Sequence, residues 1–583
     1  MPFSKKLPFF FSSFLLLLAA CTNSLPVKNE VVVHALADPE MLNPCNSIDA
    51  TSGYITGYMF QKLVDADYLN PPELVPVLAE SRPKIEKTSD GKMTLTFNIR
   101  KEARWDNNTP ITAKDVEFSI KTIKNPLVNN PNAKPYFAFI SDFIFYPEDP
   151  LKLTVVSNEI YFLAEASFTD IFILPEYLYD PKGLMRKFTV KMLAEKSDSL
   201  KSDPAIKEFA DDFNSEKRMR DPNFIGGSSP YKYTDWKTNE RVTLTKKENW
   251  WGNALLNTNC YFDAYPDKLI FQTVKDPTTA LVSLKAGNID VMHGIKSKDF
   301  PDLIKSEKFK QNFNGYTPME FSYVYMGFNT KSPLISDKQT RQALAHLVNI
   351  DEIIKTVKYG EATSIIGPIH PSKKKAYNSN LQNYTYDLNL AKEMLAKAGW
   401  KNTNGDETLD KIINGKRTEF VLEFIVNAGN EERKSIALMF QEQAKKVGVK
   451  VNVSTLDWAV FLEKCRNHQF DMQMGKWVSS PNPDDLKQTY SSEAASNGGS
   501  NFSNWTNLRA DALMDSIRSE IDEEKRNSMY MRIQELMHEE LPMIFMYAPT
   551  EHIAISKKFE NAPPCVLRPG YWLPGFKLKE AGH

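Results

Sequence analysis

The chain has little cysteine, and the spacing of its cysteines excludes whole classes of site. Five cysteines occur in 583 residues. The four that follow Cys21 lie far apart, so no CxxC zinc or redox motif is present; they are Cys45, Cys260, Cys465 and Cys565. Whether these thiols pair in disulfides or stay free and buried is left open by the sequence.

An excess of positive or negative charge is also missing. Lysine and arginine number 72 against 73 aspartates and glutamates, which gives a net charge of −1. Nucleic-acid-binding proteins need a basic surface, and the chain has no long Lys/Arg run, so we expect no nucleic-acid partner. Beyond the first residues, no apolar run reaches the length of a membrane span.

Motifs for catalysis, metals and cofactors are absent as well. The histidines are scattered, and His538-Glu539-Glu540 is not an HExxH zinc motif. Residues 402–407 (NTNGDE) resemble half of a calcium loop but lack the bidentate glutamate at its twelfth position. No GxSxG, Walker A or GxGxxG sequence occurs. We therefore expect a protein that is not an enzyme and that carries no metal or cofactor.

The first residues are typical of an export signal. Lys5-Lys6 precede an apolar run, residues 9–18, that is too short to span a bilayer. The run leads into Leu18-Ala19-Ala20-Cys21, which resembles the lipobox of bacterial lipoproteins. We expect cleavage after residue 20 and lipid on Cys21, with the acyl chains anchoring the protein to a membrane. A plain secretory signal followed by a chance cysteine is the alternative.

The rest of the chain is typical of soluble globular domains, with 42% hydrophobic and 25% charged residues. Its length predicts two or three domains. Residues 31–33 predict a first strand, and residues 51–64 predict a helix. Residues 74–120 predict a hairpin turned by Asp90-Gly91, a strand, a second turn and a helix capped by Thr112.

The block at 74–120 resembles the signature of the family 5 extracellular solute-binding proteins, the oligopeptide- and dipeptide-binding group. It reads LVPVLAESRPKIEKTSDGKMTLTFNIRKEARWDNNTPITAKDVEFSI. It departs from the signature at Arg82, where the family has tryptophan, and at Asn108, where glycine is usual. Later blocks occur in family order: GGSSPYKY, NWWGN, KAGNID and RQALAHLVNIDEII.

From residue 323 onward, strand and helix patterns alternate, which predicts an α/β domain with a mainly parallel sheet. Residues 337–348 and 431–447 predict two of its helices, and residues 386–400 predict a third that is closed by Gly399. By the resemblance, Arg341 lies in a family block and is expected to be structural.

The resemblance implies an α/β, two-lobed fold of the periplasmic-binding-protein type II class, with an extra subdomain on the larger lobe and a cleft that closes about a hinge. The expected division is a signal peptide at 1–20, a tether at 21–30, lobe I at 31–62, 223–318 and 546–583, its extra subdomain at 63–222, and lobe II at 319–545. The roles of residues 125–224 are left open.

The main candidate for a ligand-binding wall is residues 470–490, FDMQMGKWVSSPNPDDLKQTY. The pattern predicts a strand that stops near Trp477, because Pro481 and Pro483 lack the N–H donor that a central ladder needs. A strand that ends in an aromatic residue and a polar loop is one way to build such a wall. By the resemblance, Trp477 is the tryptophan of the family's ligand cleft.

Ser480 stands where the family usually has an aspartate that pairs with a peptide's α-amine. A neutral hydroxyl does not replace that charge-assisted bond. Asp484 or Asp485 could reach the amine from the following loop, or both could cap the helix that starts near Leu486. The candidate ligand-binding residues are Trp477, Val478, Ser479, Ser480, Asp484 and Asp485, with Thr51, Ser52 and Tyr54 from lobe I and Met546 and Tyr547 from the returning strand.

The resemblance implies a monomeric, lipid-anchored protein that binds extended oligopeptides or dipeptides and delivers them to the permease subunits of an ABC importer. It would lie on the periplasmic face of a membrane, or on the outer face of the cell membrane in a single-membrane cell. The alternatives are another solute, such as a glycan fragment, metal chelate or modified peptide, and an adhesin or chaperone on the same scaffold. Ligand identity and length are left open.

Overall fold

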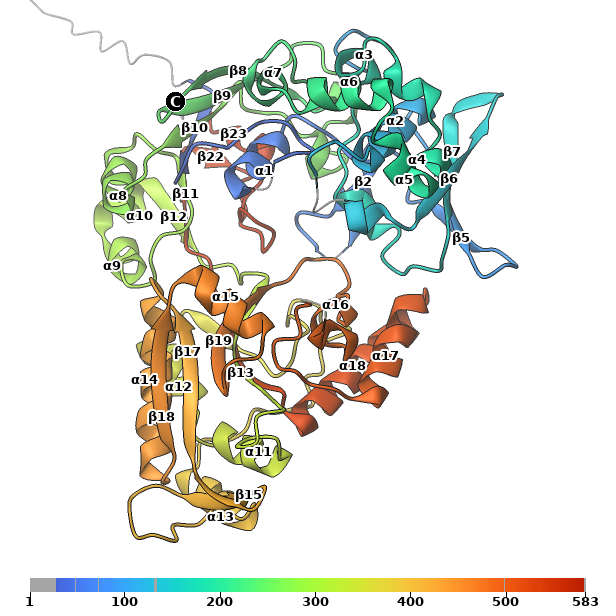
Figure 1. Ribbon diagram of the computed structural model, residues 1–583. Helices are drawn as coiled ribbons and strands as arrows, with labels where there is room; N and C mark the ends of the chain where they lie inside the picture. The colour runs from blue at the N-terminus through green and yellow to red at the C-terminus, as the bar shows by residue number, and fades with distance from the viewer. Residues whose placement is uncertain (1–27, 48, 72, 131–133, 497–498, 581–583) are drawn as a thin grey trace, which may run out of the picture.

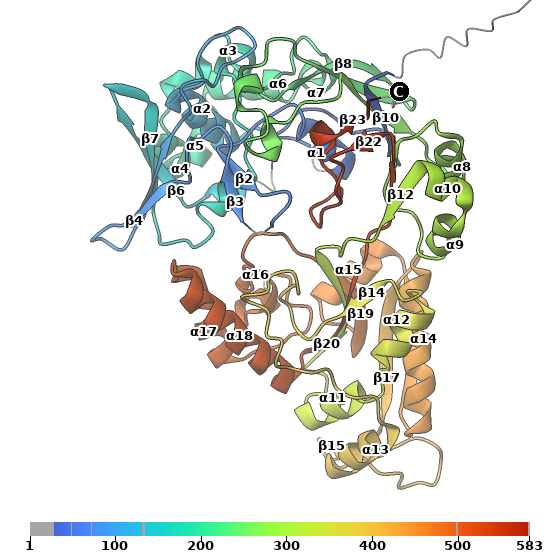
Figure 2. The same ribbon diagram turned by 180° about the vertical axis from the view of Figure 1, so that it is seen from behind.

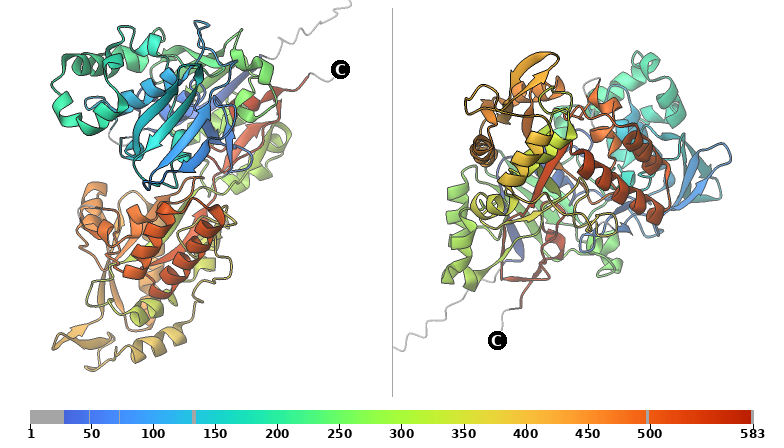
Figure 3. Two further views of the ribbon diagram at one scale, coloured as in Figure 1. Left: turned by 90° about the vertical axis from the view of Figure 1, so that its right-hand side faces the viewer. Right: turned by 90° about the horizontal axis from the view of Figure 1, so that it is seen from below.

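The computed structural model describes residues 28–47, 49–71, 73–130, 134–496 and 499–580, which form two lobes (Figure 1). Figure 3 shows the lobes as separate bodies in side view. The expected signal peptide at 1–20, the expected lipidation site Cys21 and most of the expected tether lie outside the described residues. Among the helices described, none combines the length and the apolar character needed to cross a membrane.

Lobe I is built on one mixed sheet. Its strands lie in the order β12 (Phe313–Tyr316), β21 (Ile553–Ser556), β11 (Val291–Met292), β1 (Glu30–Ala35), β10 (Lys268–Thr273), β9 (Arg241–Lys246) and β8 (Tyr231–Lys237). The first strand, β1, runs parallel to β10, with Val31 opposite Leu269. Val31 and Val33 are buried in the lobe I core, as expected for an alternating apolar strand. The C-terminal segment, with β22 (Phe559–Glu560) and β23 (Lys577–Leu578), returns to this lobe (Figure 2).

The extra subdomain has its own sheet and core. Its strands lie in the order β4 (Lys84–Lys87), β5 (Met93–Asn98), β7 (Asp149–Ser157) and β6 (Ile140–Tyr146). The predicted helix is α2 (Ala113–Lys124), which Thr112 and Asp115 close with a capping box. Both departures from the family signature have local roles. Asn108 has a φ of 66°, a conformation that asparagine tolerates in place of glycine, and Arg82 forms a two-point ion pair with Glu165 at 2.6 and 2.8 Å.

Part of the predicted subdomain range 63–222 packs into the lobe I core, although Val190 belongs to the subdomain core. Short helices between residues 176 and 220 contribute Tyr179, Phe209 and Phe213 to the lobe I core rather than to the subdomain core. These helices are α3 (Glu176–Tyr179), α4 (Val190–Glu195), α5 (Ser197–Leu200), α6 (Pro204–Phe213) and α7 (Glu216–Arg220). The helix predicted at 51–64 is shorter in the structure: α1 (Ala50–Thr56) ends before Gly57, and β2 (Val64–Ala66) pairs with β3 (Leu74–Pro76) instead.

Lobe II contains a sheet in the order β14 (Ala362–Ser364), β20 (Met543–Pro549), β13 (Ser322–Phe328), β19 (Met472–Val478), β17 (Val421–Asn427) and β18 (Lys450–Leu456). The prediction of a mainly parallel sheet is wrong. β17 is parallel to β18 and β19, whereas β13 is antiparallel to both β19 and β20. The reason is topological: the chain enters lobe II along β13 and leaves along its neighbour β20, so these strands run in opposite directions.

Helices cover both faces of the lobe II sheet, which explains the continuous apolar run of β20. Val324 and Met326 pack toward α14 (Glu431–Lys446), and Tyr323 and Tyr325 pack toward α17 (Leu508–Ser519) and α18 (Glu523–Glu540). The other helices are α11 (Lys338–Ala345), α12 (Ile350–Thr356), α13 (Leu388–Lys397), α15 (Trp458–Arg466) and α16 (Lys487–Tyr490). Arg341 is structural, as expected, because it is buried and donates to the carbonyls of Ile335, Ser336, Glu540 and Leu541.

Two neighbouring segments connect the lobes. The chain passes from β12 to β13 through residues 317–321, and from β20 to β21 through residues 550–552. Glu320 N–H donates to Pro549 O and Glu551 N–H donates to Pro318 O, both at 2.8 Å. β20 stays in the lobe II sheet to Pro549, so lobe II extends past the predicted boundary at 545. Paired crossing segments of this kind form a hinge.

Candidate functional site

Cavities of about 860, 390 and 290 Å3 lie between the lobes. Each has walls from both sides of the hinge. The 390 Å3 cavity lies between residues 161–170 of lobe I and the end of β19 with its following loop. The 290 Å3 cavity lies between α1 and the same loop, and the 860 Å3 cavity lies beside the hinge. We refer to the three together as the interlobe cleft.

Trp477 lines the 390 Å3 cavity from lobe II, near the end of β19. Its indole is parallel to the ring of Tyr325, with centroids 6.5 Å apart and an interplanar angle of 6°, and it stacks on Phe502 at 5.7 Å. These contacts fix the orientation of the indole, which is half-buried. The next residue, Val478, is 60% exposed. A rigid aromatic surface beside an open apolar side chain is suited to contact an elongated ligand.

The backbone of β19 is open on one edge along this wall. On one side, β13 pairs with β19 over its whole length from Met472 to Val478. On the other side, β17 pairs only at Met472 and Gln473. Beyond Gln473, this edge has no strand partner in the described part of the chain. An unpaired edge offers backbone N–H and C=O groups to an added extended segment.

Asp484 lines the 390 Å3 cavity but is already neutralised. Its Oδ2 lies 2.6 Å from Nζ of the buried Lys373, and its Oδ1 accepts a hydrogen bond from Ser479 Oγ at 2.9 Å. Lys373 Nζ also donates to Asn482 O at 2.6 Å. Burial lowers the pKa of Lys373, and the Asp484 charge opposes that effect. The pair therefore stiffens the loop instead of presenting a free carboxylate.

Asp485 is also committed within the protein. Its Oδ1 accepts a hydrogen bond from Lys487 N–H at 3.2 Å, at the start of α16, and its Oδ2 lies 3.4 Å from Nε of Arg518. Burial raises the pKa of Asp485, and the Arg518 charge opposes the shift. Of the two alternatives for this pair of carboxylates, helix capping describes Asp485.

The lobe I candidates divide into one that lines the cleft and two that do not. Tyr54 lines the 290 Å3 cavity together with Ser480 of the opposite lobe. Its ring meets His293 edge to face at 5.9 Å. Ser52 is fully buried, where its hydroxyl bonds Asp49 and accepts from Met41 N–H. Thr51 lines none of the three cavities and lies one residue from the start of α1.

The two candidates on the returning strand β20 also differ in whether they line the cleft. Tyr547 lines the 860 Å3 cavity, whereas Met546 is fully buried in the lobe II core. Both side chains belong to a strand whose residues are buried throughout, so the sequence pattern alone could not separate them. Tyr547 is itself buried and packs in the same core as Met546, because a register shift between β13 and β20 interrupts the alternation here. Only its place on the wall of the 860 Å3 cavity separates Tyr547 from Met546.

Charged residues that sequence reasoning missed gather around Glu320 of the hinge. Lys476 Nζ lies 2.9 Å from both Glu320 carboxylate oxygens, and Arg568 from the C-terminal segment bonds the same carboxylate. In the same cavity Lys358 Nζ pairs with Glu432 at 2.9 Å. Each of these residues is isolated in the sequence, so no local signal could have identified the group. Glu320, Lys476, Lys358 and Glu432 give the 860 Å3 cavity a wall of paired charges, and Arg568 lines the 290 Å3 cavity.

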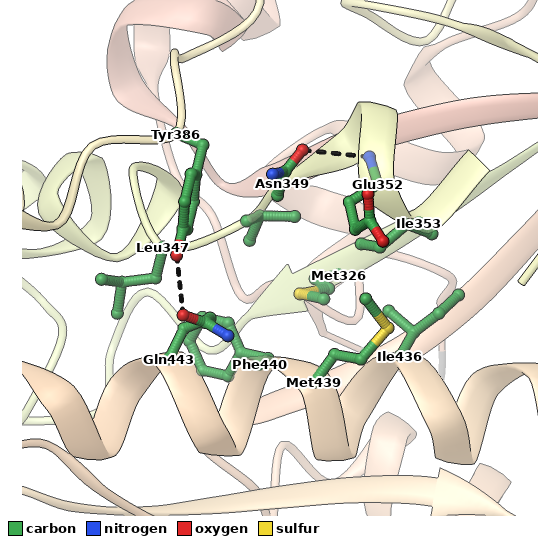
Figure 4. A pocket seen from close by; sticks show the side chains of 11 residues that line it. Met326, Leu347, Asn349, Glu352, Ile353, Tyr386, Ile436, Met439, Phe440 and Gln443 are labelled. Atoms are coloured by element: carbon green, nitrogen blue, oxygen red, sulfur yellow. Dashed lines mark hydrogen bonds between the residues drawn. The ribbon is translucent and has the colours of Figure 1, made fainter. Parts of the chain in front are cut away.

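A further cavity, of about 170 Å3, lies inside lobe II between α12, α14 and the segment that precedes α13 (Figure 4). Met326, Ile436 and Met439 line it. Its polar groups bond one another: Tyr386 OH donates to Gln443 Oε1 at 2.7 Å, and Asn349 Oδ1 accepts from Glu352 N–H at 3.0 Å. Because the lining is mainly apolar and these two hydrogen bonds are made within the protein, we assign no ligand to this cavity.

Among the described residues, no group of three or more His, Cys, Asp or Glu side chains is arranged to hold a metal ion. The four cysteines described are free thiols. Burial raises the pKa of Cys45, Cys260 and Cys465 to about 12, which disfavours the reactive thiolate at neutral pH.

Comparisons with known proteins agree with this architecture. The profile of the bacterial extracellular solute-binding proteins, family 5, matches residues 73–500. The oligopeptide-binding protein AppA of Bacillus subtilis is 27% identical over 541 residues, which cover 91% of this chain and 88% of AppA. Heme-binding protein A of Haemophilus influenzae is 25% identical over 552 residues, covering 90% and 88%.

The fold is also that of solved structures. The structure of Bacillus subtilis AppA in complex with a nonapeptide superposes with a TM-score of 0.66 at 24% identity, covering 94% of this chain and 99% of AppA. This similarity shows the two-lobed type II binding-protein fold. The match of the family profile to most of the chain shows that the protein belongs to the bacterial extracellular solute-binding proteins of family 5.

Proposed function

We propose that this protein is the substrate-binding component of an ABC importer and that it binds extended oligopeptides or dipeptides in the interlobe cleft. The observation that carries the proposal is the open edge of β19 beside Trp477, inside a cleft with walls from both lobes. An extended peptide satisfies its backbone groups by adding to such an edge, and its side chains then enter the flanking cavities. The peptide-binding relative AppA supports the same class of ligand.

The binding mechanism follows from the hinge. A ligand held on lobe II becomes buried when lobe I rotates onto it, so contacts from both lobes contribute only in the closed state. No bond is made or broken, and the protein acts without catalysis. A permease would then distinguish the closed, loaded form from the open form by its shape.

Isothermal titration calorimetry of the purified protein with a pool of di- to hexapeptides tests this function. We expect saturable heat, and we expect peptides to co-purify and to be seen by native mass spectrometry. Absence of heat with every pool, together with absence of a co-purified peptide, would contradict the proposal.

The second candidate is a non-peptide solute such as a metal chelate, glycan fragment or modified peptide. It is favoured by Ser480, which provides no carboxylate on the loop that follows Trp477, and by the heme-binding relative. Native mass spectrometry of the protein purified from its own cells separates the two candidates, because the mass of the retained ligand identifies its class.

We further propose that the mature protein begins at Cys21, that it is a monomer and that lipid on Cys21 holds it at the cell envelope. The support is the sequence Leu18-Ala19-Ala20-Cys21 after a short apolar run. Cys21→Ser should release the protein from the membrane fraction into the soluble fraction. Membrane association that is unchanged in this variant would refute the lipid anchor.

A further inference from the structure

Asp170 lies where the 390 Å3 and 290 Å3 cavities of the cleft meet. It follows the short 3-10 helix η2 (Ala166–Thr169), and its N–H closes that helix by donating to Ser167 O at 3.0 Å. Three residues line both the 390 Å3 and the 290 Å3 cavities, and they are Asp170, Ser480 and Asn482. The carboxylate of Asp170 on lobe I therefore faces the same space as Ser480 on lobe II.

The two walls touch at this point. Asn482 Nδ2 donates to Thr169 Oγ1 at 3.2 Å, across the cleft and directly beside Asp170. The other end of the same amide, Asn482 Oδ1, is buried and has no hydrogen-bond partner among the described residues. A buried acceptor without a partner is unfavourable unless a donor arrives from a ligand or from water. Asn482 thus brings an acceptor without a partner to the point where the lobes meet, one residue from Asp170.

Asp170 differs from every other carboxylate on these two cavities. Asp484 has Lys373 at 2.6 Å, Asp485 has Arg518 at 3.4 Å, and Asp65 has Lys62 at 2.9 Å. Within the described ranges, Asp170 makes no hydrogen bond or ion pair through its carboxylate. Lys62 is the cation that acts on it, and Asp65, which already pairs with Lys62, opposes that effect.

The protein around Asp170 balances the charge of its carboxylate only in part. Solvent reaches the carboxylate through the open cleft, yet the protein on both sides desolvates it and raises its pKa. Closure of the lobes would remove more of this water. A carboxylate in that position is stabilised by a cation that enters with the ligand.

We propose that Asp170, with Asn482 Oδ1 and the Ser480 hydroxyl opposite, forms a subsite for a primary ammonium group, and that in a peptide ligand this group is the α-amine. The inference rests on the proposed function. An ammonium has three N–H donors, and the subsite offers three kinds of acceptor: a carboxylate, an amide oxygen and a hydroxyl. Because Asp170 lies on lobe I and the peptide backbone adds to lobe II, the amine links ligand binding to closure.

The test compares a pool of di- to hexapeptides with the same pool after N-acetylation, by calorimetry on the purified protein. Wild type should prefer the free-amine pool. Asp170→Asn should weaken binding of the free-amine pool by about 10- to 100-fold, the range for a charge-assisted bond, and should leave binding of the acetylated pool unchanged. Asp211→Asn is the matched control, because Asp211 is an exposed carboxylate on α6 of the same lobe, outside the cleft cavities.

A second variant tests whether a carboxylate on the opposite wall can replace the one removed from residue 170. In Asp170→Asn/Ser480→Asp, a carboxylate returns to the shared space from the opposite wall, so the preference for the free amine should be restored. Equal binding of both pools by wild type, or equal loss of both in Asp170→Asn, would overturn the subsite while the proposed function stands. Failure of wild type to bind either pool would overturn both.

Discussion

At the residue scale, the side chains that define the cleft are held by partners from distant parts of the chain. Lys373 neutralises Asp484, Lys476 and Arg568 share Glu320, and Tyr325 orients Trp477. Only the charged and polar groups that lack such a partner remain available to bind a ligand. This is why a carboxylate close to Trp477 in sequence, Asp484, is a poorer partner for an amine than Asp170 on the other lobe.

His370 gives a pH dependence that belongs to one residue. It is fully buried, its Nε2 donates to Glu320 O at 2.9 Å and its Nδ1 accepts from Ser372 N–H at 3.2 Å, so the ring is neutral. Burial, with the nearby Lys373 charge, lowers its pKa from 6.5 to about 3. Between these values the unfolded chain binds a proton that the folded protein does not, so acidification lowers the free energy of unfolding.

His370→Gln should therefore reduce the loss of stability on acidification, by up to about 1.4 kcal/mol per pH unit below pH 6.5. Urea denaturation at several pH values between 7 and 4 gives the free energy of unfolding of wild type and variant as a function of pH. The slope of that dependence is then compared between the two proteins. An equal pH dependence in the two proteins would show that His370 takes up a proton as readily in the folded protein as in the unfolded chain, which would contradict its buried, neutral state.

At the element scale, segments were predicted well where the signal is local and poorly where it depends on a distant neighbour. Thr112 caps α2 as expected, because a capping box is contained within four residues. The direction of β13 and β20 could not be read from their apolar patterns, because it is set by where the chain enters and leaves lobe II. The helix at 51–64 was overextended for a similar reason: Val64 is apolar, but its partner is Pro76 in β3.

The residues of the candidate site were likewise predicted only where the sequence gives a local signal. The end of β19 and its proline-rich loop were predicted, since Trp477 and Pro481 give local signals. Glu320, Arg568 and Asp170 were not predicted, because each is a single charged residue that the fold brings to the cleft from a separate segment. The spacing of residues along the chain does not show which distant residues the fold brings together.

The docking of the loop at residues 225–230 onto the segment after α1 gives an element-scale prediction. A Cβ on Gly227 would lie 2.5 Å from Met59 O and 2.6 Å from the Phe60 ring, so backbone would have to move. Gly227→Ala should lower the free energy of unfolding by about 1–3 kcal/mol, as overpacking does.

Gly226→Ala is the control next door, since its nearest contact would be an ordinary 3.4 Å to a Leu178 methyl. It should leave stability unchanged or slightly raised, because alanine has less freedom than glycine in the unfolded chain. Chemical denaturation measures both. Equal destabilisation by the two substitutions would contradict the close approach of the loop to Met59.

At the scale of the whole molecule, one hinge governs how the lobes move. Both crossing segments are hydrogen-bonded to each other, and Glu320 in one of them connects Lys476 of lobe II to Arg568 of lobe I. The cleft cavities lie along the boundary that this hinge opens and closes. A ligand that touches both walls, at Trp477 and at Asp170, would therefore favour the closed arrangement by mass action.

Small-angle X-ray scattering during a peptide titration tests this account most directly, because it reports the separation of the lobes while binding proceeds. The account predicts that the radius of gyration falls as the di- to hexapeptide pool is added and that it saturates at the same ligand concentration as the calorimetric heat. Saturable heat with an unchanged radius of gyration would contradict the claim that the ligand is bound by closure of the interlobe cleft.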